Sequence, residues 1–114
     1  MEVARGEIWW AELPPPLGSE SGNRRPVLVV QANEFNNSKI ATIVVAALTT
    51  NLRLGAAPGN VLVGSKESGL RQDSVVNVTQ ISTIDRSFLR TKAGRLKPES
   101  LRAVEDGIRL VLAL

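Results

Sequence analysis

The sequence contains no cysteine and no histidine. Without cysteine the chain can form neither disulfides nor thiolate metal sites. Without histidine it lacks the commonest general base and the commonest zinc ligand in proteins. Any chemistry must therefore come from carboxylates, hydroxyls, lysine, arginine or the backbone. The longest apolar run covers residues 43–48, far short of the ~20 residues that cross a bilayer. No apolar signal segment follows the first residues either, and both observations favour a cytoplasmic protein.

The excess of positive charge is small, and its distribution is informative. The formal net charge is +3, and all of it comes from residues 58–114, which carry nine basic and six acidic side chains. Ten of the fourteen basic residues are arginine, whose planar guanidinium suits phosphate better than the lysine ammonium does. Two interpretations fit this pattern, a solvated surface and a polyanionic partner. The length of 114 residues predicts a single domain over residues 1–114.

Short segments rich in bulky and β-branched residues predict a series of strands. These segments cover residues 7–13, 26–31, 40–48, 61–63, 73–81 and 91–96. Between them we expect a long loop after residues 14–16, at most one helical turn over 32–38, a loop over 64–71 and a helical turn over 83–89. The strand at 26–31 is apolar on both faces, which predicts either burial on both sides or one face in the core and one in an interface. The strand at 40–48 is also apolar throughout, and two such strands in so small a domain indicate a buried dimer interface.

One long helix is predicted from Pro98 onwards. Proline is favoured at the first helical position, and Glu99 suits the positive end of the helix dipole. An apolar stripe follows at helical spacing, consisting of Leu101, Val104, Ile108 and Val111 and widened by Leu110, Leu112 and Leu114. Gly107 costs the helix about 1 kcal/mol relative to alanine, which indicates close packing at that position. The predicted fold class is therefore mainly β with helices (α+β), a small, partly open barrel with the C-terminal helix packed against it.

Several motifs in a fixed order resemble the MazF/PemK toxins. The motifs are Arg5-Gly6-Glu7-Ile8-Trp9, Gly18-Ser19-Glu20, Arg25-Pro26-Val27-Leu28, Ala47-Leu48-Thr49-Thr50-Asn51, Asp73-Ser74-Val75-Val76, Gln80-Ile81-Ser82-Thr83-Ile84-Asp85-Arg86 and Gly94-Arg95-Leu96. They cover nearly the whole chain. The resemblance implies an SH3-like barrel of the CcdB/Kid/MazF type, a homodimer, cleavage of single-stranded RNA at a short sequence, and a cognate antitoxin whose acidic tail occupies the RNA groove.

The same resemblance assigns roles to individual residues. Arg25 matches the family's catalytic arginine and Thr49 the threonine that acts with it. Gly18, Ser19 and Glu20 match a mobile loop that covers the substrate, and Gln80 matches a position near the RNA groove. Arg24, Thr50 and Asn51 complete the expected substrate-binding set, with Arg24 either a second phosphate contact or a solvated neighbour. The Kid toxins carry an arginine and an aspartate where this chain has Asn77 and Thr79, and a histidine in place of Ser19. The Kid acid–base pair therefore does not carry over, and the chain resembles the branch that relies on arginine and threonine.

The chemistry of these residues fits RNA cleavage without a metal or another cofactor. RNA supplies its own nucleophile, the 2′-hydroxyl, so catalysis needs donors aimed at the charged phosphate oxygens. Arg25 can supply a fork of donors, but its pKa is above ~12, so we assign it electrostatic stabilisation rather than proton transfer. A threonine hydroxyl is a poor base, and Glu20 is the nearest candidate in sequence for the general base. The carboxylates are too scattered to wrap a hard cation.

Alternatives remain for several of these features. Thr49 at a strand end can satisfy local backbone groups instead, and Trp9 and Trp10 fit core or interface positions better than base-stacking positions. The basic residues of 86–102 fit a solvated face or a groove for an acidic partner. A protein-binding toxin resembling CcdB would need an aromatic C-terminal end, which residues 111–114 do not provide. A member that only binds RNA or antitoxin is the third hypothesis.

Overall fold

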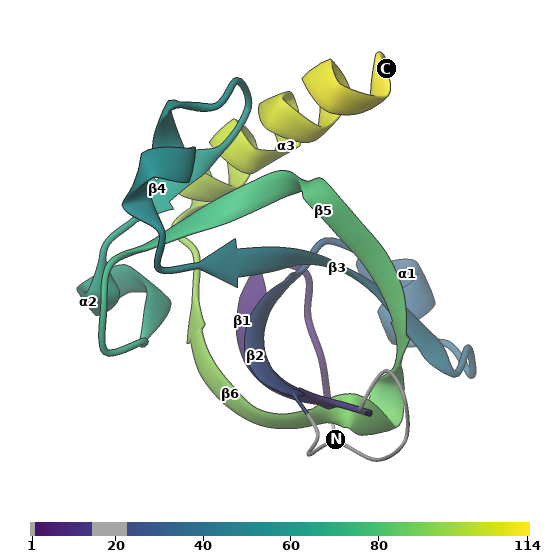
Figure 1. Cartoon of the computed structure of the whole chain (residues 1–114). Helices are drawn as coiled ribbons and strands as arrows, with labels where there is room; N and C mark the ends of the chain where they lie inside the picture. Colours follow the sequence, from purple (N-terminus) through teal and green to yellow (C-terminus); the bar gives the residue numbers. More distant parts are fainter. Residues whose placement is uncertain (1, 15–22) are drawn as a thin grey trace.

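The computed structural model describes residues 2–14 and 23–114. In this part of the chain six antiparallel strands form one sheet in the order β4-β5-β3-β2-β1-β6. The strands are β1 (Glu7–Leu13), β2 (Asn23–Val29), β3 (Thr42–Thr49), β4 (Val61–Val63), β5 (Ser74–Asp85) and β6 (Leu89–Arg95). The sheet curls into a half-barrel (Figure 1), which confirms the predicted fold class.

Three helices and two 3₁₀ turns complete the described structure. The helices are α1 (Asn33–Asn36), α2 (Ser65–Ser68) and α3 (Pro98–Leu112), and the turns are η1 (Leu52–Ala56) and η2 (Arg86–Phe88). Figure 1 shows α3 outside the barrel, beside β4 and β5. No helix in these ranges combines the length and the apolar character that a bilayer crossing demands.

The central strands separate two hydrophobic cores because their side chains alternate between the faces of the sheet. Ile8 and Leu28 belong to the core that packs against Val104 of α3. Trp9 and Val27, one residue along each strand, belong to the core on the other face. Of the two alternatives for the second strand, the structure shows burial on both sides within the chain, since Val27, Leu28 and Val29 are all buried.

Helix α3 meets the rest of the fold through a contact between two glycine backbones. A Cβ atom built on Gly107 would lie 2.1 Å from the carbonyl oxygen of Gly59, so only glycine fits and the predicted close packing is confirmed. The predicted apolar stripe is wrong at its C-terminal end. Val104 is fully buried, but the last turn leaves apolar side chains exposed, namely Leu110, Val111, Leu112 and Leu114. No other described element covers them, because the helix extends past the edge of the sheet (Figure 1).

Two strands are longer than their patterns predict. Strand β2 begins at Asn23 instead of Pro26, because its polar first residues pair with the end of β1 as the arm of a hairpin. Strand β5 continues to Asp85, beyond the predicted end at Ile81. A bulge allows this, since the pairing with β3 shifts from Ala47↔Asn77 to Ala46↔Ile81. The extra residues break the alternation and let β5 bend around the barrel, which leaves only η2 of the predicted helical turn.

A buried carboxylate joins the two strands of one sheet edge. Glu7 is 5% exposed and accepts hydrogen bonds from the Ala4 amide at 2.8 Å and the Trp9 indole at 3.1 Å. The ammonium of Lys92 and the guanidinium of Arg95, both on β6, lie 2.9 and 3.2 Å from its other oxygen. Burial raises the pKa of Glu7, but these hydrogen bonds and the Lys92 charge outweigh burial, and the net pKa lies below the ordinary glutamate value.

Candidate active site

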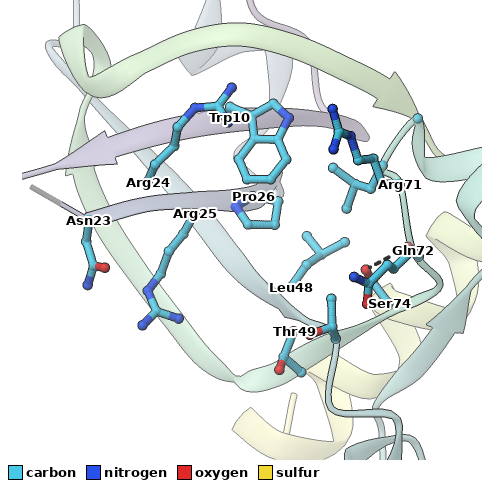
Figure 2. A pocket seen from close by; sticks show the side chains of 13 residues that line it. Trp10, Asn23, Arg24, Arg25, Pro26, Leu48, Thr49, Arg71, Gln72 and Ser74 are labelled. Atoms are coloured by element: carbon cyan, nitrogen blue, oxygen red, sulfur yellow. Dashed lines mark hydrogen bonds between the residues drawn. The ribbon is translucent and has the colours of Figure 1, made fainter.

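An open cleft of about 860 Å³ lies where β2, β3 and the segment between α2 and β5 come together (Figure 2). Three groups of residues line it: Trp10 from β1 with Asn23, Arg24, Arg25 and Pro26 from β2; Leu48, Thr49 and Thr50 from the end of β3; and Gly69, Leu70, Arg71, Gln72 and Ser74 from the segment after α2. The volume falls within the ~300–1,000 Å³ of typical ligand sites.

The cleft exists because the first residues of β2 pair with β1 but not with β3. Strand β2 pairs with β1 from Leu28 back to its first residue, Asn23, but with β3 only from Val27 onwards. The residue before this point is Pro26, which has no N–H to donate to a ladder. Beyond it, Thr49 pairs with Val75 of β5 instead. The first residues of β2 are thus held firmly on one side and open on the other.

This geometry brings the two predicted catalytic residues to one face of the opening. Continuing the β2–β3 register past Val27↔Ala47 sets Arg25 opposite Thr49. Side chains alternate along a strand, so both share the face of Val27 and Ala47. Figure 2 shows Arg25 extending away from Trp10, whereas Arg24 turns toward it. The two adjacent arginines therefore serve opposite sides of the same cleft.

The cleft is positively charged. Arg24, Arg25 and Arg71 line it, and none of the lining residues in the described part of the chain is acidic. No carboxylate within residues 2–14 and 23–114 lies at ion-pair distance from these three guanidinium groups. Arg25 is exposed, and the proline that follows it favours an extended backbone at Arg25, as its place in β2 shows. Such a surface binds an anion without first having to break an internal ion pair.

Thr49 takes part in a local hydrogen bond that orients its hydroxyl. Its Oγ1 accepts from the Asn51 N–H at 3.1 Å, as the alternative interpretation of this residue proposed. The hydroxyl proton is not used in that bond and can be donated to a bound anion. The two interpretations of Thr49 are therefore compatible.

The other predicted binding residues are only partly brought together. Arg24 and Thr50 line the cleft. Asn51 instead caps η1, its side chain accepting from the Arg53 N–H at 3.3 Å. Gln80 is exposed in the bulge of β5 and is not among the lining residues. Gly18, Ser19 and Glu20 lie outside the described residues.

Two neighbours of Gln80 clarify the difference from the Kid pattern. The Thr79 hydroxyl donates to the Asn77 side-chain oxygen at 2.9 Å. This pair is neutral and lies outside the cleft, so it cannot replace an arginine and an aspartate. Within the described ranges no cluster of three or more histidine, cysteine, aspartate or glutamate residues could hold a metal ion.

The basic residues of 86–102 do not contribute to the cleft. Arg90 pairs with Glu12 at 3.4 Å, and Lys92 and Arg95 pair with Glu7. Arg86 donates to the Ile40 carbonyl at 3.3 Å. Most of this charge is therefore engaged within the protein.

Sequence reasoning missed Arg71 and Gln72, and it favoured a core or interface position for Trp10, which packs against a core but also lines the cleft. Arg71 and Gln72 stand in a segment interpreted only as a loop, yet they immediately precede β5. Antiparallel pairing of β3 with β5 places the end of one beside the start of the other. Had that pairing been predicted, the residues just before Ser74 would have been neighbours of Thr49. Trp10 lacked such a signal, because its neighbour Trp9 is indeed in a core.

Comparisons with known proteins found a matching family and several relatives. Residues 4–112 match the family described as PemK-like, MazF-like toxin of type II toxin-antitoxin system. Endoribonuclease MazF6 of Mycobacterium tuberculosis is 43% identical over 114 residues, which cover all of both chains. Endoribonuclease EndoA of Bacillus subtilis is 39% identical over 114 residues, covering all of this chain and 97% of the other.

The fold also matches solved structures. One is an endoribonuclease in complex with its cognate antitoxin from a mycobacterial species. It superposes with a TM-score of 0.79 and 25% sequence identity, covering 98% of this chain and 96% of the other.

Proposed function

Because this chain belongs to the family of PemK-like, MazF-like toxins of type II toxin–antitoxin systems, we propose that it is an endoribonuclease toxin. Its substrate is single-stranded RNA, cut at a short recurrent sequence without a metal ion. The observation that carries the proposal is the cleft that holds Arg25 and Thr49 on one face. Among the described residues its lining has three arginines and no acidic residue. Its named relatives are endoribonucleases.

The proposed reaction is an attack within the RNA itself. The 2′-oxygen forms a bond to the adjacent phosphorus while the bond from phosphorus to the 5′-oxygen breaks. The proton of the 2′-hydroxyl passes to a base, and the departing 5′-oxygen takes up a proton. The products are a 2′,3′-cyclic phosphate and a 5′-hydroxyl. DNA lacks the 2′-hydroxyl and is spared.

Each site residue has a separate task in this reaction. Arg25 holds two phosphate oxygens in its guanidinium fork and stabilises the negative charge that builds on them. Thr49, with its oxygen fixed by the Asn51 N–H, donates its proton to the same group. Neither side chain is suited to accept a proton, so the base comes from elsewhere. Glu20 remains the nearest carboxylate in sequence.

A cognate antitoxin with an acidic tail is the proposed protein partner, and a homodimer is the proposed functional state. Support for the first is the positive cleft, which suits carboxylates as well as phosphates. Support for the second is the exposed apolar end of α3, where Leu110 is 61% and Leu114 83% exposed. Such a patch is commonly covered by a partner. An mRNA substrate also places the protein in the cytoplasm.

The decisive experiment is cleavage of a long single-stranded RNA in EDTA. Wild type is compared with Arg25→Ala and with Arg102→Ala, an exposed arginine of α3 outside the cleft. We expect recurrent cutting by wild type and the control, and a loss of roughly 10²–10³-fold in rate for Arg25→Ala, the range for removing one oxyanion donor. Mapped ends should carry the cyclic phosphate or its hydrolysis product.

Three outcomes would contradict parts of the proposal. Equal cutting of an all-deoxy strand would exclude attack by the 2′-hydroxyl. Cutting that stops in EDTA and returns with a divalent cation would exclude the metal-independent route. No cutting by folded wild type would leave a protein that binds RNA or antitoxin without catalysis.

A further inference from the structure

Trp10 presents its indole to the cleft, unlike its neighbour Trp9. Trp9 is 6% exposed and buried in a core, whereas Trp10 is half-buried and lines the cleft with Pro26, Leu48 and Leu70. The indole packs against the core that contains Leu48 and Leu70. Figure 2 shows the indole in the upper part of the cleft, with Arg24 and Arg71 on its two sides in this view.

Arg24 covers the ring. Its guanidinium carbon lies 4.3 Å from the centre of the Trp10 indole, a cation–π contact. No carboxylate of the described residues pairs with Arg24, so the indole is the only strong partner that these residues offer it. A phosphate binds a guanidinium more strongly, through charged and bidentate hydrogen bonds. A nucleotide can therefore exchange both partners, giving its phosphate to Arg24 and its base to Trp10.

We propose that Trp10 is a stacking platform for one unpaired base of the RNA and that Arg24 is its removable cover. The base lies on the opposite side of the β2 end from Arg25, because Arg24 and Arg25 alternate along the strand. Arg71, across the indole, contacts the phosphate beside the stacked base. Trp10 is thus a binding residue for a base next to the cleavage point, outside the catalytic pair. This inference rests on the proposed function.

The ligand must be single-stranded. A duplex hides the faces of its bases within the stack, so only an unpaired base can lie flat on an indole. Stacking on an aromatic side chain is tolerant of sequence. The platform therefore adds affinity and excludes duplexes, and it leaves the choice of cleavage sequence to other groups.

The test uses tryptophan fluorescence and a non-cleavable probe, a mixed-sequence single strand with 2′-O-methyl groups throughout. Wild type contains two tryptophans, and Trp10 is the one that the probe can reach. We expect the probe to quench wild type. In Trp10→Phe, which retains only the buried Trp9, quenching disappears while the Kd stays within about threefold, because phenylalanine still stacks. In Trp10→Leu the Kd rises roughly 5- to 150-fold, the range for losing one base–aromatic stack.

Matched controls separate stacking from general effects. Phe35→Leu removes the same kind of side chain from α1, where it is 56% exposed and outside the cleft, and should leave Kd and quenching unchanged. A double-stranded probe should not quench. Polyglutamate tests charge alone, since it can draw Arg24 away without placing a base on the ring.

The outcomes also distinguish this inference from the proposed function. Quenching without any cleavage of ordinary RNA would keep the platform and overturn the proposed function. Cleavage with unchanged fluorescence, and a Trp10→Leu variant that binds as wild type, would overturn the platform alone. Quenching by polyglutamate as strong as by the single strand, with unchanged affinity in Trp10→Leu, would likewise overturn it.

Discussion

We predict that Gly69 is needed both for the stability of the fold and for the position of the cleft residues that follow it. The substitution Gly69→Ala tests this prediction. Gly69 ends α2 with a φ of +78°, a left-handed conformation. A Cβ atom there would lie 1.8 Å from the Ala93 carbonyl oxygen on β6 and 2.6 Å from its carbon. These are backbone atoms, so no side-chain movement relieves the clash. The residues that follow, Leu70 to Gln72, line the cleft.

The cost has two sources that can be estimated separately. An alanine in the left-handed region is disfavoured by roughly 1–2 kcal/mol. Relieving the clash also requires α2 and β6 to move apart by more than 1 Å, which unpacks Leu70, now 8% exposed. Loss of one buried leucine is worth about 1.5–3 kcal/mol. We expect Gly69→Ala to lower the free energy of unfolding by about 2.5–5 kcal/mol in total, a large share of a typical ~5–15 kcal/mol.

The assay is urea unfolding at one fixed protein concentration, because a dimer's stability depends on concentration. RNA cleavage is measured below the transition and should also fall, since the Arg71 wall shifts. Gly64→Ala is the matched control at the other end of α2. Gly64 has a φ of −70°, and its nearest contact for a new Cβ is the Asp73 side chain at 3.9 Å. We expect that change to stay within about 0.5 kcal/mol of wild type.

A third variant separates strain from the clash. Asparagine tolerates the left-handed region better than alanine does, but it carries the same Cβ. Gly69→Asn should therefore be destabilised nearly as much as Gly69→Ala. Near-wild-type stability of Gly69→Asn would show that φ alone matters, and near-wild-type stability of Gly69→Ala would refute the whole argument.

Two further predictions concern charge burial and assembly. The folded pKa of Glu7 is lowered, so its stabilising contribution is present above the unfolded value of about 4.3 and is lost as pH falls through the folded pKa. Glu7→Gln should be less stable than wild type at pH 7 and lose less stability on acidification below about pH 4.3, as chemical unfolding at several pH values will show; parallel curves would contradict this. Leu110→Asp, on the exposed end of α3, should convert a dimer into monomers in sedimentation. The control Phe35→Asp changes a similarly exposed residue on α1 and should leave the dimer intact; a monomeric wild type would remove the proposed interface.

The sequence predicted the elements whose signals are local. Strand β1 has the predicted bounds Glu7–Leu13, because proline ends the bulky run. Helix α3 begins at the predicted Pro98. Close packing at Gly107 was predictable because glycine is otherwise unfavourable within a helix. The apolar stripe did not predict that the last apolar residues of α3 are exposed, because they have no partner within the described chain. A sequence pattern shows that a face is apolar without showing what covers it.

The site divides in the same way between local and long-range signals. Arg25 and Thr49 stand in recognisable motifs, and the structure places both at the cleft. Arg71 reaches the cleft only through the pairing of β3 with β5, which spans many residues. The extra residues of β5 opposite Ala46 and Ala47 interrupt the alternation of polar and apolar side chains along that strand. Long-range strand pairing was therefore the missing information for both the extended β5 and the third arginine.

The arginines of the cleft carry the same charge, but the strand geometry gives them different positions. Arg24 and Arg25 are adjacent on a stretch of β2 that is paired with β1 alone, so the backbone between them is fixed and their side chains point to opposite faces. Arg24 faces the indole of Trp10, and Arg25 faces the side of Thr49. Neither can take the place of the other without a half-turn of the strand, which β1 prevents. The opening beside Pro26 therefore has two distinct sides, and the two proposals use one each, a phosphate on the Arg25 side and a base on the Trp10 side.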